Sequence, residues 1–177
     1  MGGECVLSKT NMDEIVTYPQ KVLKLLSQNK TFVSLLTNIP NANIEDADVE
    51  TEWDFCTNDF NYVEGIIIGT KSFCCIDTEV DVVSDEIKEV IISILIGVHK
   101  SCMSLKGLGF TGIMGNRRDN LIRELDYSLR NARDFGIGKV TLNGRISPID
   151  IGSKEFVCKL IEYKVSNFAQ SRDIQHV

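Results

Sequence analysis

The chain has 177 residues, of which 43% are hydrophobic and 25% charged, and its formal net charge is −6 at pH 7. This balance is typical of a folded, soluble chain, and the length suits a single domain over residues 1–177. The longest apolar run, residues 90–98, is far too short for a bilayer, which argues against a membrane protein. The N-terminus lacks the features of a secretory signal, so we expect an intracellular product.

Charge is distributed unevenly along the chain. Residues 1–80 contain 13 acidic and 5 basic side chains, whereas residues 81–177 contain 12 acidic and 14 basic ones. All seven arginines lie at or after Arg117. Such asymmetry suits identical subunits that meet head to tail, or an oriented protein partner. It does not suit a nucleic-acid-binding protein, which would carry a basic stripe with aromatic platforms.

The cysteines give no sign of a metal centre. The six of them, Cys5, Cys56, Cys74, Cys75, Cys102 and Cys158, form no CxxC pair. Without an export signal they are expected to be reduced and mostly buried. A metal site built from His99 and Cys102 with Cys74 or Cys75 is an alternative, but its spacing fits no standard zinc pattern. We therefore predict no metal and no cofactor.

The first ordered elements are predicted to be helices. Residues 1–12 have no periodicity and are expected to form a flexible end. Apolar residues recur at near-helical intervals over 15–26, and either Asn11 or Thr17 would cap this helix. A second short amphipathic helix is predicted over 31–38. Together they are expected to pack one face against a sheet.

An acidic stretch follows at residues 41–62. It contains Glu45, Asp46, Asp48, Glu50, Glu52 and Asp54. A calcium-binding loop would need regularly spaced aspartates and a glycine, and this stretch has no glycine. Charge runs are usually solvated, so residues 41–62 are predicted to be an acidic loop whose aromatic end folds back as a lid or short strand.

The next segment predicts a β-hairpin. A short buried strand is expected at residues 65–69, a turn at 70–72, and a second strand at 73–83. Polar and apolar side chains alternate along the second strand, and Asp77, Glu79 and Asp81 share one face. That face is expected to meet water, a partner or a site.

Residues 88–142 form the unit around which the chain is organised. They predict a central strand, a long loop, a helix over 116–132 with Asn116 as N-cap, and a strand that begins at Val140. The helix is expected to bury the stripe Leu121, Ile122, Leu125, Leu129 and Ala132. If the two strands are parallel neighbours, the crossover is right-handed by default.

A long alternating strand over 154–168 and a flexible tail over 169–177 complete the chain. The pattern predicts an α/β (α+β) fold, with a mixed sheet of about four to five strands, an N-terminal helix and one crossover helix.

The loop at residues 101–115 contains the pattern GxGxxG at Gly107, Gly109 and Gly112. A dinucleotide fingerprint would place these glycines directly between strand and helix, which is not the case here. The loop instead presents the apolar residues Leu105, Leu108, Phe110, Ile113 and Met114. These side chains either form a contact in an assembly or tuck into the core of the protein, and both readings remain open.

A metal-dependent nuclease is the enzymatic alternative. Asp77 in one strand and the pair Glu86 and Lys88 at the start of the next resemble the acids and lysine of PD-(D/E)xK nucleases. Glu86 and Lys88 are expected at the solvent edge of their strand, however, and no basic face is available for a nucleic acid. No serine or cysteine nucleophile is expected beside a histidine, so we predict no enzymatic activity.

The stretch GNRRDNLIRELDYSLRNARDFGIGKVTL, followed by SPIDIGSKEFVCKLIEYKVSNF, resembles neck proteins of tailed bacteriophages. It is most similar to the tail terminator (tail completion) type. Those proteins share a strand, an arginine-bearing helix, a glycine-containing turn and a closing alternating strand, and the match covers roughly residues 88–168.

The resemblance implies a structural virion protein without catalytic residues. Such subunits form a ring, usually hexameric, that caps the tail tube and joins it to the head-side connector. The implied partners are further copies of the chain, the tail tube protein, a sheath protein and the connector, and assembly would take place in the host cytoplasm. Another neck role, such as head closure or connector adaptor, is the alternative. The contact residues expected on this basis are Leu105, Leu108, Phe110, Ile113, Met114, Arg117, Arg118, Arg130, Asp77, Glu79 and Asp81.

Overall fold

Strand β3 (Ile87–His99) lies in the middle of a mixed sheet that has six strands in the described residues. Its neighbours β2 (Ser72–Val82) and β6 (Phe156–Phe168) both run antiparallel to it. The shorter strands are β1 (Thr57–Asn58), which pairs with β2, and β4 (Ile137–Leu142) and β5 (Ser147–Ile149), which pair with β6. The computed structural model describes residues 10, 12–58, 71–84, 86–110, 112–144 and 146–169. Within them the fold is α+β, as predicted, with one strand more than expected.

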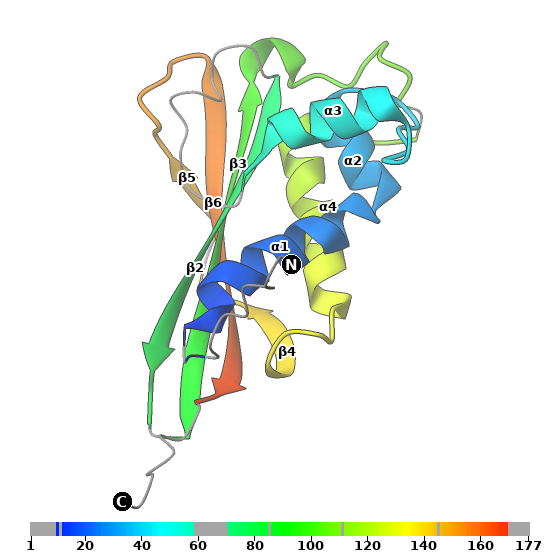
Figure 1. The fold of residues 1–177 in the computed structure, drawn as a ribbon. Coiled ribbons are helices and arrows are strands. Elements are labelled where there is room, and N and C mark those ends of the chain that lie inside the picture. Colours follow the sequence, from blue (N-terminus) through cyan, green and yellow to red (C-terminus); the bar gives the residue numbers. More distant parts are fainter. Residues whose placement is uncertain are drawn as a thin grey trace, which may run out of the picture.

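Four α-helices in the described residues lie on one side of this sheet (Figure 1). They are α1 (Asp13–Ser27), α2 (Lys30–Thr37), α3 (Ala47–Cys56) and α4 (Arg117–Asn131), and one turn of 3-10 helix, η1 (Lys100–Cys102), follows β3. No helix in this part of the chain is both long enough and apolar enough to span a membrane.

The unit β3–α4–β4 is a crossover with a strand inserted into it. Both β3 and β4 pair antiparallel with β6, so they run parallel to each other but are not neighbours. The parallel neighbours considered from the sequence are thus separated by β6. The physical reason is that β3 and β6 are both 13 residues long and pair along their whole length, whereas β4 has only 6 residues.

Helix α1 begins four residues before Thr17, one of its two predicted N-caps. It begins at Asp13, so Thr17 is not its cap and Pro19 lies inside the helix. Asn11, the other candidate, lies outside the described residues. Helix α2 begins after Asn29, whose side chain accepts a hydrogen bond from the Phe32 N–H at 3.0 Å. It ends before Asn38, a left-handed residue with φ 63°, which confirms the predicted second helix.

The acidic stretch is not the loop that the sequence predicted, because its middle forms α3. Val49, Trp53 and Cys56 are buried at helical spacing, and the Trp53 ring meets the Phe32 ring edge to face at 6.2 Å. This apolar stripe fastens α3 to α2 while the acids stay on the outer side. Acids in the first turn also suit the positive end of the helix dipole. The short strand β1 follows directly.

The two faces of the sheet differ. The face under α1–α4 carries the main core, to which β3 contributes Val90, Ile92, Ile94, Ile96 and Val98. The face opposite α1–α4, here called the far face, carries a smaller buried cluster of Phe73, Cys75, Leu95, Phe156 and Cys158. That cluster occupies only one half of the far face. The other half is charged.

Three of the predicted segments lie wholly or mostly outside the described residues. The strand expected at residues 65–69 lies outside the described residues, as do most of the flexible ends expected at 1–12 and 169–177.

Candidate assembly surfaces

The loop between β3 and α4 divides into buried anchors and exposed side chains. Leu105 is 5% exposed, and Phe110 and Ile113 are half-buried against the main core. Leu108 is 41% exposed and Met114 is 87% exposed. Three of the five apolar residues therefore tuck into the core, as one of the two readings expected, and the other two are exposed.

The glycines of GxGxxG shape this loop rather than the start of the helix. Gly107, Gly109 and Gly112 have φ of 75°, 78° and 79°, values that favour glycine. Helix α4 begins only at Arg117, and its N-terminus is capped by Asn116, whose side-chain oxygen accepts from the Asp119 N–H at 2.9 Å. Asn116 is therefore confirmed as the predicted N-cap. The last glycine of the pattern, Gly112, lies before it in the chain and is not part of the helix N-terminus.

Arg117 is not the exposed contact residue that the sequence predicted, because its side chain is completely buried. The guanidinium donates to the Cys102 carbonyl at 2.8 Å, to the Leu35 carbonyl at 2.7 Å and to the Asn38 side chain. It also lies 5.2 Å from the centre of the Phe110 ring. Burial lowers the pKa of Arg117. These contacts tie the loop to the C-terminal end of α2, where a cation is favoured by the helix dipole.

The two other predicted arginines differ in access. The Arg118 side chain is only 15% exposed and pairs with Asp119 at 2.9 Å. The Arg130 side chain is 73% exposed, although it pairs with Asp126 at 2.6 Å one helical turn away. Of the three predicted arginine contacts, Arg130 is the one that a partner could reach readily.

The predicted hairpin acids do share one face of β2, and it is the far face. Glu79 and Asp81 are exposed and Asp77 is half-buried, whereas Cys74, Ile76 and Thr78 are buried under the helices. The alternation along this strand is therefore confirmed. Its polar side points away from α1–α4.

The charged half of the far face also contains apolar side chains. Asp81 lies opposite Glu89 in the pairing of β2 with β3, and Glu89 pairs with Lys164 of β6 at 3.3 Å. At the strand ends Ile87 lies opposite Phe168, and they are 43% and 68% exposed. We call this surface the acidic sheet patch, made up of Asp77, Glu79, Asp81, Glu89, Glu162, Lys164, Ile87 and Phe168.

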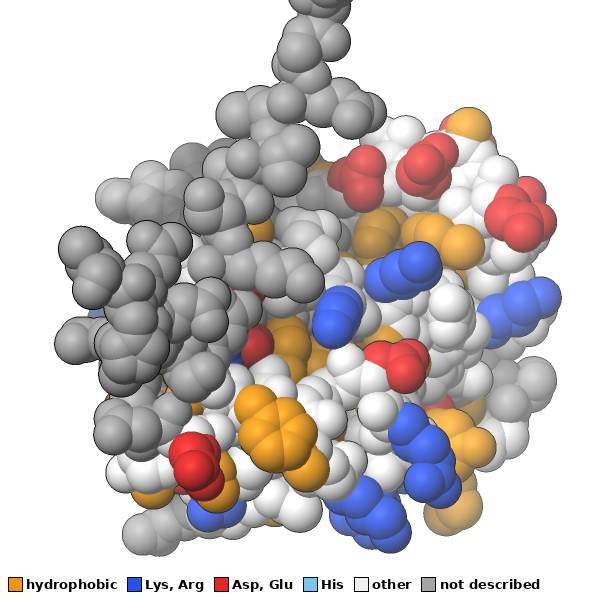
Figure 2. Space-filling view, turned by 60° about the horizontal axis from the view of Figure 1, so that its bottom comes forward, with side chains coloured by type: hydrophobic (Ala, Val, Ile, Leu, Met, Phe, Trp, Pro, Cys, Tyr) orange, Lys and Arg blue, Asp and Glu red, His pale blue; other side chains and the backbone are white. Residues whose placement is uncertain are grey.

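The outer side of α1, α2 and α4 has the opposite character, whereas α3 carries exposed acids. Figure 2 shows several Lys and Arg side chains over the half of the molecule where the helices lie, with Asp and Glu side chains among them and along the upper edge. The exposed residues of this basic helical patch are Lys21, Lys24, Lys30, Arg123, Tyr127, Arg130 and Arg133. Lys21 donates to the Asp134 carbonyl at 3.2 Å, which joins α1 to the end of α4. The Tyr127 ring, 66% exposed, stands between Arg123 and Arg130 on α4.

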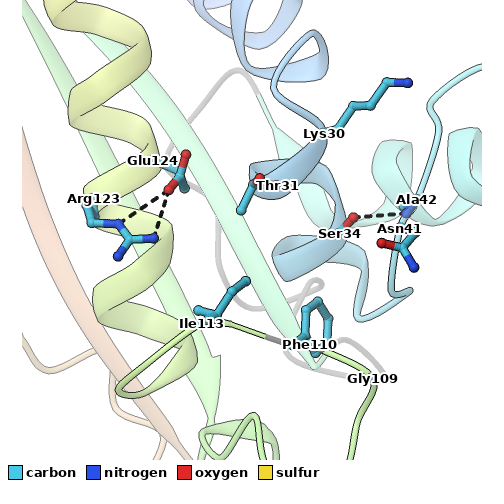
Figure 3. Close-up of a pocket in the computed structure, with 10 residues that line it drawn as sticks. All are labelled: Lys30, Thr31, Ser34, Asn41, Ala42, Gly109, Phe110, Ile113, Arg123 and Glu124. Carbon is cyan, nitrogen blue, oxygen red and sulfur yellow. Dashed lines mark hydrogen bonds and ion pairs between the residues drawn. The ribbon is translucent and has the colours of Figure 1, made fainter.

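An open groove of about 500 Å³ lies between α2, α4 and the loop (Figure 3). Lys30 and Arg123 stand on its two sides, and Phe110 and Ile113 form an apolar part of its wall. Arg123 is held there by Glu124 at 3.0 Å. The groove therefore connects the loop with the basic helical patch.

The three residues of the nuclease alternative do not come together. Asp77 lies on the far face, whereas Lys88 lies under the helices. Lys88 is not at the solvent edge, as the sequence predicted, but buried, with its ammonium 2.6 Å from the Glu14 carboxylate. Glu86 is exposed ahead of β3. An acid and a lysine on opposite faces of a sheet cannot hold one metal ion and its water.

The alternative metal site is not assembled either. Cys74 and Cys75 are buried on opposite faces of β2, and burial raises the pKa of Cys75 to about 12. Within the described residues no group of three or more His, Cys, Asp or Glu side chains is placed to hold a metal ion.

His99 has neighbours that sequence reasoning missed. One ring nitrogen lies 2.6 Å from the Ser101 hydroxyl, and the other lies 2.9 Å from the Glu155 carboxylate. Serine, histidine and acid in this order resemble a catalytic triad. However, the Glu155 side chain is 75% exposed, and Ser101 is exposed on a single helical turn. The Ser101 N–H also donates to His99 at 3.2 Å, so the cluster acts as a cap that joins β3 to β6.

The described residues thus define a two-layer α+β protein with two charged surfaces on opposite sides. The family model named YomW matches residues 29–167, and the chain belongs to the YomW family. This is the name of a phage-derived family and supports a phage origin, although it does not specify a role in the neck or tail. A search of curated proteins gives no significant match.

Proposed function

We propose that this chain is a structural virion protein of a tailed phage, similar to a tail terminator, which forms a ring on the tail tube and joins the tail to the head-side connector. Its partners are then further copies of itself, the tube protein, a sheath protein and the connector. In this role the protein needs no cofactor and catalyses no reaction, and it moves from the host cytoplasm into the neck of the particle.

The observation that carries this proposal is the pair of oppositely charged surfaces on the two sides of one small domain. Subunits of a ring meet head to tail, so each needs two different surfaces that complement each other. A second support is the loop between β3 and α4. Met114 is exposed while Leu105 and Arg117 hold the loop in place, an arrangement suited to contact with another ring.

The membership of a phage-derived family agrees with this role at a coarser level. The terminator type, as opposed to head closure or connector adaptor, rests on the similarity of residues 88–168 to neck proteins. The nuclease alternative has lost its support because Asp77 and Lys88 lie on opposite faces of the sheet.

Two measurements test the proposal. The mass of the purified protein in solution and electron micrographs of it are expected to reveal a closed ring, and labelling of the protein in intact particles is expected to mark the junction of head and tail. A strict monomer that is absent from virions would contradict the proposal. A label at the connector instead of the tube end would favour another neck role.

A further inference from the structure

We infer that copies of this chain bind one another through the acidic sheet patch of one subunit and the basic helical patch of the next. This inference rests on the proposed ring and goes further, because it assigns the two surfaces and the residues that meet. The occupant of each patch is a second copy of the chain.

Charge is the first argument. On the acidic sheet patch Glu79 and Asp81 are exposed, and Lys164 is the one basic side chain that the patch contains. On the basic helical patch six Lys and Arg side chains stand beside four acids, Glu45, Glu124, Asp126 and Asp134. Each patch would repel a copy of itself and attract the other, which favours unlike surfaces in contact over like ones.

Apolar side chains supply the second argument. Ile87 and Phe168 face each other across β3 and β6 and are 43% and 68% exposed, although such side chains gain free energy when they are buried. Tyr127 is about as exposed as Phe168 and lies in the middle of the basic helical patch. Aromatic side chains surrounded by charge are typical anchors of protein interfaces. Phe168 and Tyr127 are therefore assigned as the apolar anchors of the contact.

The position of the two patches supplies the third argument. The sheet has α1–α4 on one side and the far face on the other, so the patches point in opposite directions (Figure 1). Surfaces on opposite sides of a subunit cannot satisfy each other in a two-fold dimer. They join head to tail, and such a contact closes into a ring or continues as a filament.

The test is a pair of charge reversals in the full-length protein, with self-association measured by sedimentation velocity at low salt. The variant Glu79→Lys with Asp81→Lys and the variant Arg130→Glu with Arg133→Glu are each expected to weaken self-association by at least about tenfold, since like charges then meet. Mixing the two variants is expected to restore association, because the reversed surfaces complement each other again. Rescue of this kind separates a direct contact from a loss of folding.

A matched control is Asp48→Lys with Glu50→Lys, which reverses two exposed acids on α3 outside both patches and is expected to leave association unchanged. Two results would overturn the inference: a parent chain that stays monomeric, or charge reversals on the patches that have no more effect than the control. If rings persist in the patch variants and the label still marks the neck, the proposed function stands and only the assignment of surfaces fails.

Discussion

The Lys88 ammonium lies 2.6 Å from the Glu14 carboxylate, and the two residues are 74 positions apart in the chain. The Lys88 side chain is 2% exposed and that of Glu14 is 10% exposed. Asn167 donates a further hydrogen bond to Glu14 at 2.7 Å. This buried pair fastens α1 to the ends of β3 and β6.

Removing one member of this pair is expected to be costly. Lys88→Met leaves the Glu14 carboxylate buried without its cation, which should lower the free energy of unfolding by about 3–5 kcal/mol. The double change Glu14→Leu with Lys88→Met should cost less than the single one, as urea denaturation can measure. Lys164→Met, which breaks the exposed pair with Glu89, serves as the control and should cost about 1 kcal/mol or less. Equal losses in the Lys88 and Lys164 variants would contradict the buried role of Lys88.

Gly97 makes room for an aromatic ring on the far face. A Cβ atom at Gly97 would lie 2.2 Å from the tip of Phe73, its partner in the pairing of β2 with β3. Gly97→Ala is therefore expected to displace the ring and destabilise the protein by about 1–3 kcal/mol. Thermal unfolding of the variant tests this. Adding Phe73→Leu should make the cost of Gly97→Ala smaller, and a cost that does not change would show that the ring is not the cause.

Arg117 is expected to be essential for the position of the loop. Arg117→Lys keeps the charge but loses the fork that reaches three oxygens, so it should destabilise the protein by about 2–3 kcal/mol. The same variant should be cut faster by protease at residues 103–116. Arg123→Lys on the exposed side of α4 is the matched control. If both variants behave alike in the two assays, the anchoring role of Arg117 is wrong.

Stability is expected to fall in alkaline solution. Burial raises the pKa of Cys56 to about 12 and that of Cys158 to about 11, and burial together with the charge of Glu14 raises the pKa of Tyr18 to about 12. In the unfolded chain the pKa of cysteine is about 8.5 and that of tyrosine is about 10. The folded state thus keeps protons that the unfolded state releases. The stabilisation is complete below pH about 8.5 and is lost as pH rises toward the folded values.

Urea denaturation at about pH 7 and about pH 10 measures this loss, because the slope of stability against pH counts the protons released on unfolding. Cys56→Ala should make the decline shallower, since one of the raised groups is then missing. A free energy of unfolding that stays constant or rises between these two values would contradict the expected sign.

Much of the local structure could be predicted because it depends on spacing. The alternation around Asp77 and Glu79 placed them on one face of β2, and the stripe from Leu121 to Leu129 placed α4 against the sheet. The acidic stretch was predicted wrongly as a loop because its six acids dominate the pattern. The helical spacing of the three buried residues Val49, Trp53 and Cys56 is less conspicuous. For the candidate surfaces, sequence identified the acids and Arg130 but missed Tyr127 and Phe168, which look like ordinary core residues in a one-dimensional pattern.

By itself, therefore, the sequence determined periodicity: the type of the strongly periodic segments, which side of each is apolar, and that charge differs between the two halves of the chain. Only the tertiary structure decided which residues meet. It placed β6 between β3 and β4, buried Lys88 against Glu14, and buried Arg117 against the carbonyls of Leu35 in α2 and Cys102 in η1. The physical reason is that a pattern within one segment reports the environment of that segment, whereas a buried charge depends on a partner that the chain supplies from far away.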